Sequence, residues 1–135
     1  MKNKIFIFDL DDTLYKEIDF LYSAYREIAG WIELKFSLKG IYAFMLETYK
    51  EQADVFSRLI DTYDLSLTKA DLLSIYRSHR PNIRLELDTL KALEVLKQDF
   101  ILGMITDGRS ITQRNKFQAL GLEQFIENEN LVISE

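Results

Sequence analysis

Two aspartates, Asp9 and Asp11, follow the apolar run Ile5–Phe8 and offer the clearest chemistry in the sequence. If the chain stays extended, side chains two residues apart point to the same side, so the two carboxylates should lie close together. Neighbouring carboxylates repel each other unless a cation or a shared proton relieves them. Mg²⁺ suits such a site because it prefers hard oxygen ligands and keeps part of its water shell. One carboxylate could then act as a nucleophile while the other exchanges a proton.

The same two residues could also be an acidic turn or a helix cap after a strand. Acidic pairs are common, so Asp9 and Asp11 alone leave the chemical and the purely structural interpretation equally open. A second polar feature at a neighbouring strand end is needed to favour the chemical one.

Thr106-Asp107-Gly108 is such a feature, since it follows the apolar run Phe100–Ile105. A hydroxyl at a strand end, followed by glycine and the start of a helix, could hold a phosphate, because backbone N–H groups and the helix dipole favour an anion there. For this segment alone a plain strand-to-helix turn is the better interpretation. Beside Asp9 and Asp11, we favour Thr106, Asp107 and Gly108 as phosphate-binding residues.

The strands that must deliver these residues are short and apolar throughout. Ile5–Phe8 and Phe100–Ile105 are typical of strands buried on both faces in a parallel sheet, and Leu131–Ile133 begins or forms a third strand. The sequence therefore predicts an α/β fold with a partial Rossmann-like parallel sheet of three strands. We expect the sheet core to comprise residues 1–14 and 81–135.

Residues 15–80 are expected to form a helical cap inserted after the first strand. Apolar residues recur there at helical spacing, and the sequence predicts helices over Ile18–Phe36, Ile41–Tyr63 and Thr68–His79. Thr68 and Asp71 resemble a capping box.

Two further helices should connect the strands of the core. The first begins at the N-cap Asp88, and the second opens with a capping box over Ser110–Gln113 and is closed by Gly121.

The composition excludes several classes of function. The net charge is −5 and Lys and Arg are scattered, which argues against nucleic-acid and membrane partners. The chain has no cysteine, so it can form neither a disulfide framework nor a thiolate zinc site. The first apolar stretch stops at Asp9, too early for a signal peptide or a membrane span, and a cytoplasmic location is expected.

Together these motifs resemble those of the haloacid dehalogenase superfamily. The strand followed by Asp9-Leu10-Asp11-Asp12-Thr13-Leu14 resembles the first motif of that family, and the strand that ends at Thr106 resembles the second. Their order, their separation and the helical cap between them also match. The stretch Glu123–Glu135 resembles the segment that leads into the third motif, so the resemblance extends over the whole chain.

The resemblance implies a magnesium-dependent phosphatase that acts on a small phosphorylated metabolite. Asp9 would be the nucleophile that forms an aspartyl-phosphate, and Asp11 would be the general acid/base. Mg²⁺ would be bound by a carboxylate oxygen of Asp9 and the backbone carbonyl of Asp11. Asp12 is expected to face solvent or to cap the next turn. A non-catalytic binding or regulatory module that keeps the fold is the alternative.

The family's third and fourth motifs, a lysine and a later acidic pair, are expected after the third strand, so the chain resembles a truncated member. Lys116 lies in the helix after the second motif, which is the wrong place for that lysine. Without further strands, Ile5–Phe8 would be an exposed apolar edge, and we expect a homo-oligomer or another contact to cover it.

His79, the only histidine, lies between Arg77 and Arg80 near the return from the cap to the core. These basic residues could bind anionic groups of a substrate. A solvated helix end that complements the helix dipole is the favoured interpretation.

Overall fold

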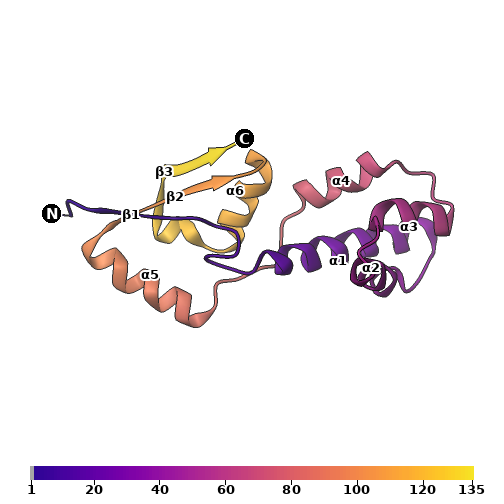
Figure 1. The fold of residues 1–135 in the computed structure, drawn as a ribbon, viewed down its shortest axis with the longest axis horizontal. Helices are drawn as coiled ribbons and strands as arrows, with labels where there is room; N and C mark the ends of the chain where they lie inside the picture. The colour runs from indigo at the N-terminus through magenta and orange to yellow at the C-terminus, as the bar shows by residue number, and fades with distance from the viewer. Residues whose placement is uncertain (1) are drawn as a thin grey trace. The chain divides into compact units, whose positions relative to one another are not determined.

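The computed structural model describes residues 2–135, which form three β-strands, six α-helices and one short 3₁₀ helix. The chain divides into two compact units (Figure 1). The sheet unit contains the residues up to Leu21 together with Arg80–Glu135, and the helical unit is Tyr22–His79. The helical insert is expected at residues 15–80, and the helical unit of the structure begins at Tyr22 and ends at His79.

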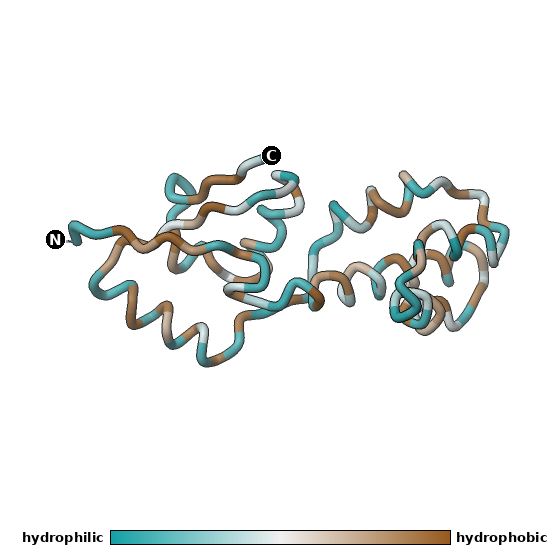
Figure 2. Tube along the Cα trace, viewed as in Figure 1, coloured by the Kyte–Doolittle hydropathy of each residue, from teal (hydrophilic) through white to brown (hydrophobic). Residues whose placement is uncertain are grey.

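The sheet has the strand order β1-β2-β3, and both neighbouring pairs are parallel. This confirms the predicted α/β class with three parallel strands. The strands are β1 (Ile5–Phe8), β2 (Ile101–Asp107) and β3 (Ile126–Ser134). The third strand begins earlier than the predicted Leu131, and a register irregularity between Leu102 and Met104 accommodates its first residues. Figure 2 shows β1 as a hydrophobic stretch that gives way to hydrophilic residues where the strand ends.

One face of the sheet is buried against helices. Leu102, Met104 and Thr106 alternate along β2 and are almost fully buried. Two helices connect the strands, α5 (Leu87–Asp99) and α6 (Ser110–Ala119), and the 3₁₀ helix η1 (Leu122–Gln124) follows. Phe117 of α6 and Leu93 of α5 supply further buried apolar side chains.

The predicted helix boundaries in this unit are partly wrong. The N-cap of α5 is Glu86 instead of Asp88, which lies in the first turn. The N-cap of α6 is Arg109 without a side-chain hydrogen bond, so the predicted capping box over Ser110–Gln113 does not form. Gly121 does follow the end of α6 with the predicted left-handed conformation, at φ 68°.

The opposite face of the sheet is apolar and exposed. Residues that share this face through the strand register are between 41% and 53% exposed: Ile5, Ile7, Ile101, Ile105 and Val132. Strand β1 also lies at the edge of the three-stranded sheet, as expected. Contiguous apolar surface next to an open strand edge favours association with other chains.

We therefore expect the 135-residue chain to self-associate through this face. Light scattering should report an average mass above that of the monomer, and Ile7→Lys should lower it, because the charge would be buried in the contact. Val95→Lys is a matched control, since Val95 is also exposed but lies on α5. A monomeric parent chain at high concentration would contradict this expectation.

The helical unit contains the greater part of α1 (Glu17–Phe36), and all of α2 (Ile41–Lys50), α3 (Val55–Tyr63) and α4 (Lys69–Ser78). The single helix predicted over Ile41–Tyr63 is wrong. Gln52 has a left-handed conformation at φ 59°, and the Asp54 side chain caps α3 by accepting a hydrogen bond from the N–H of Ser57 at 3.2 Å. The predicted capping box of Thr68 and Asp71 is present.

His79 lies at the predicted helix end, as the C-cap of α4, and Arg80 beside it is exposed. The interpretation as a solvated residue is wrong for His79 itself, which is buried. The residue is 7% exposed, with Nε2 3.1 Å from the Ser23 hydroxyl and Nδ1 2.8 Å from the Tyr76 carbonyl. A carbonyl only accepts, so Nδ1 donates and the neutral ring accepts at Nε2 from Ser23. Burial lowers the pKa of His79, and the hydrogen bond to Tyr76 and the charge of Glu27 oppose this only in part.

The free energy of unfolding should therefore fall on mild acidification. The pKa of His79 is below the usual value of about 6.5 in the folded state, so the unfolded chain binds more protons as the pH falls through that value. Urea titrations between about pH 8 and about pH 5.5 should show this loss, and His79→Gln should flatten it, since no other histidine is present. An unchanged pH dependence in the variant would remove His79 as its source.

Among residues 2–135, none of the helices combines the length and the apolar character that crossing a membrane requires.

Candidate active site

Asp9 is the first residue after β1, and the chain turns immediately after it. Leu10 is fully buried, and its carbonyl accepts hydrogen bonds from the N–H groups of Thr13 at 3.2 Å and Leu14 at 3.0 Å. Asp9 is exposed, and its Oδ1 accepts a hydrogen bond from the Leu10 N–H at 2.8 Å. Buried Leu10 thus anchors the turn while the Asp9 carboxylate stays accessible.

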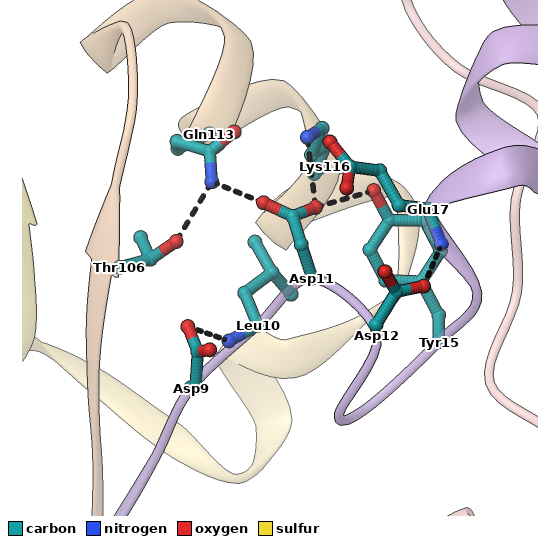
Figure 3. Close-up of polar contacts among 9 residues, drawn as sticks. All are labelled: Asp9, Leu10, Asp11, Asp12, Tyr15, Glu17, Thr106, Gln113 and Lys116. Carbon is teal, nitrogen blue, oxygen red and sulfur yellow. Dashed lines mark hydrogen bonds and ion pairs between the residues drawn. The ribbon is translucent and has the colours of Figure 1, made fainter.

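Asp11 lies in a different environment, where three side chains donate to its carboxylate (Figure 3). Oδ1 accepts from the Tyr15 hydroxyl at 2.7 Å and from Lys116 Nζ at 2.8 Å. Oδ2 accepts from Gln113 Nε2 at 3.1 Å. Both oxygens of Asp11 are therefore engaged, and two of the three donors come from α6.

Lys116 is 4% exposed, which is rare for a lysine. Its ammonium forms an ion pair with Asp11 and lies 4.6 Å from the centre of the Phe20 ring. Because a buried ammonium without a partner is strongly destabilising, this ion pair fixes α6 against the turn that follows β1.

Gln113 connects Asp11 with Thr106. Its Nε2 donates to Thr106 Oγ1 at 2.7 Å as well as to Asp11, and Figure 3 shows it between the two. Thr106 is 1% exposed. A threonine hydroxyl that accepts one hydrogen bond still has its own proton to donate.

Asp107 and Gly108 lie where β2 ends and the chain turns towards α6. Gly108 has φ 139°, and a Cβ there would meet Gln113 Cδ at 3.1 Å, so glycine is needed for Gln113 to pack this closely. The N–H of Gly108 donates to the Ser134 carbonyl at 2.9 Å and is not available to an anion in this structure. Asp107 is exposed and pairs in register with Ser134.

The electrostatic balance at Asp11 favours the carboxylate. Burial alone would raise its pKa, but the hydrogen bonds from Lys116, Tyr15 and Gln113 and the charge of Lys116 outweigh burial and hold the pKa below its usual value. Asp12 takes no part in this cluster, because its Oδ1 accepts from the N–H of Glu17 at 2.9 Å, at the start of α1.

Gln113, Lys116 and Tyr15 are residues that the sequence did not assign to the site. The sequence pattern predicts only a helix-capping role for Gln113, and it places Lys116 outside the expected position of the third-motif lysine. The sequence does hold one signal: Gln113 and Lys116 are three residues apart and so share a helix face, and the apolar Phe117, four residues after Gln113, adjoins that face.

The oxygen donors near the end of β1 are of the type that Mg²⁺ prefers. The accessible carboxylate of Asp9 can serve as a ligand, whereas the Asp11 carboxylate is already bound by three donors. Across residues 2–135, no group of three or more His, Cys, Asp or Glu side chains could hold a metal ion together. These residues therefore fit part of a magnesium shell.

A family model for the haloacid dehalogenase-like hydrolases matches residues 6–130. The chain belongs to this family. The matched range includes the turn after β1, the end of β2 and α6, and so all the residues of the cluster around Asp11.

Individual relatives agree with this membership. A glyceraldehyde 3-phosphate phosphatase of Methanocaldococcus jannaschii is 27% identical over 134 residues, which cover 90% of the chain and 59% of the relative. Among solved structures, the HAD-hydrolase candidate YfnB of Bacillus subtilis, bound to magnesium, has a TM-score of 0.60 at 18% identity, with 98% of this chain and 64% of that chain covered. A candidate β-phosphoglucomutase from Thermotoga maritima has a TM-score of 0.57 at 13% identity, with 97% and 61% covered.

At these identities the structural matches show the fold. The chain spans about three fifths of the length of the proteins that it matches.

Proposed function

We propose that the chain forms part of a magnesium-dependent phosphatase that acts on small phosphorylated metabolites through an aspartyl-phosphate at Asp9. The observation that carries the proposal is the contrast between the two aspartates. Asp9 is exposed and accepts a hydrogen bond from one backbone N–H, whereas Asp11 is held by Lys116, Tyr15 and Gln113. An accessible carboxylate suits a nucleophile, and a restrained one suits a proton-transfer group.

In the first step, a carboxylate oxygen of Asp9 forms a bond to phosphorus, and the bond from phosphorus to the leaving oxygen breaks. Asp11 gives a proton to that oxygen. In the second step, Asp11 takes a proton from a water molecule, whose oxygen attacks phosphorus and releases the Asp9 carboxylate and inorganic phosphate.

The resting protonation of Asp11 fits this sequence of steps. Its environment favours the carboxylate in the absence of substrate. A phosphate dianion beside Asp11 disfavours a second negative charge and so raises the carboxyl pKa. We expect Asp11 to take up its proton together with the substrate.

Mg²⁺ would be held by the Asp9 carboxylate and the backbone carbonyl of Asp11, and its remaining ligands would be water, phosphate oxygens or groups outside this set. When bound, it would neutralise charge on the transferred phosphoryl group. The magnesium in the YfnB structure supports this choice of metal. The Thr106 hydroxyl would donate to a phosphate oxygen.

The printed names of two relatives support the proposed substrate class. The phosphatase that is 27% identical acts, by its name, on a three-carbon phosphate ester, and the second structural relative is a sugar-phosphate mutase candidate. Both descriptions support a small phosphorylated metabolite.

Asp9→Asn should lower the rate of 4-nitrophenyl phosphate hydrolysis by roughly 10³-fold or more, because an amide is not a nucleophile. Asp12→Asn is the matched control: Asp12 lies outside the cluster and has a left-handed φ of 58°, which asparagine tolerates. The measurement is release of nitrophenolate with magnesium by the product of the complete gene.

Substantial activity in Asp9→Asn would remove Asp9 from its role. Absence of any phosphatase activity in the parent protein would favour a non-catalytic binding module instead.

A further inference from the structure

We infer that Lys116 and Gln113 are positioning residues, which hold the carboxylate of Asp11 in the orientation from which it exchanges a proton with the leaving oxygen. The inference rests on the proposed phosphatase function. It assigns a role to two residues of α6 that belong to neither of the motifs recognised in the sequence.

The burial of Lys116 points to a specific role for its charge. A lysine that is 4% exposed loses most of its hydration, and a methionine would fill a similar space without that loss. The ammonium lies 2.8 Å from Asp11 Oδ1 and is flanked by the rings of Phe20 at 4.6 Å and Tyr15 at 6.0 Å. Lys116 is therefore placed to bind one oxygen of Asp11.

Gln113 fixes the other oxygen. Its Nε2 lies 3.1 Å from Asp11 Oδ2 and 2.7 Å from Thr106 Oγ1, and its side chain packs against Gly108, where a Cβ would come within 3.2 Å of Gln113 Cγ. Gln113 thereby links the proton-transfer group to the hydroxyl at the end of β2. Rotation of the Asp11 carboxylate would break contacts on both oxygens.

Such restraint matters because proton transfer requires the donor and acceptor atoms to lie within about 2.6–3.2 Å. A shift of about 1 Å can lower a rate by two orders of magnitude. Loss of Lys116 or Gln113 should therefore impair the transfer of the proton more than the attack by Asp9.

Two aryl phosphates of similar shape separate these effects. The leaving group of 4-nitrophenyl phosphate departs readily as an anion, whereas phenolate is more basic and gains more from protonation. The experiment measures kcat/KM for both substrates, since this ratio reports the steps up to the first phosphoryl transfer. The protein is the product of the complete gene, with magnesium present.

Lys116→Met should lower kcat/KM for phenyl phosphate roughly tenfold more than for 4-nitrophenyl phosphate. Gln113→Leu, which keeps a side chain to pack against Gly108, should show the same bias, as should Asp11→Asn. Combining Lys116→Met with Asp11→Asn should lower kcat/KM no further than Asp11→Asn alone. Lys116→Arg keeps the positive charge and should therefore retain a higher kcat/KM for phenyl phosphate than Lys116→Met. Lys91→Met on α5 is the matched control, because Lys91 is exposed. It should leave kcat/KM unchanged for both substrates.

If Lys116→Met lowers kcat/KM equally for the two substrates, or if its effect adds to that of Asp11→Asn, the role of Lys116 is purely structural. This outcome would overturn the inference and leave the proposed function intact. If Lys116→Met does not fold, Gln113→Leu and Lys116→Arg decide the question by the same bias. A parent protein that hydrolyses neither substrate would instead refute the proposed function.

Discussion

The ion pair between buried Lys116 and half-buried Asp11 constrains most of the candidate site. It joins residues 105 positions apart, and each charge has given up much of its hydration, so neither can lose its partner cheaply. Leaving a buried ammonium without its opposite charge typically costs about 3–5 kcal/mol. The turn after β1 and helix α6 therefore stay in contact, and the pairing of β1 with β2 brings the two strand ends to the same edge of the sheet.

The same constraint gives the two aspartates different surroundings. Asp11 receives all three side-chain donors, while Asp9, two residues earlier, stays exposed at the end of β1. Two carboxylates of one type thus differ because their surroundings differ, which is the usual way in which acid, base and nucleophile roles are separated in one site. Gly108 serves this arrangement as well, since its missing side chain allows Gln113 to reach both Asp11 and Thr106.

The sequence predicts the parts of this structure that depend on local patterns. The apolar runs before Asp9 and Thr106 are parallel strands, and α6 ends before Gly121, as predicted. These features are predictable because strand and helix-end signals lie within a few residues of one another. The break between α2 and α3 was missed, since the N-cap Asp54 lies in an otherwise continuous helical pattern. The roles of Gln113 and Lys116 could not be predicted, because their partners are distant in the chain and a single sequence does not reveal which buried polar residues meet.

The central claim is that phosphate passes through the carboxylate of Asp9. The most direct test is to mix the magnesium-loaded protein with a phosphate ester, quench it during turnover, reduce it with borohydride and map the products by mass spectrometry. An acyl phosphate is reduced to an alcohol, so our account predicts homoserine at position 9 and an unmodified Asp11. Reduction at another carboxylate, or none at all during active turnover, would contradict it.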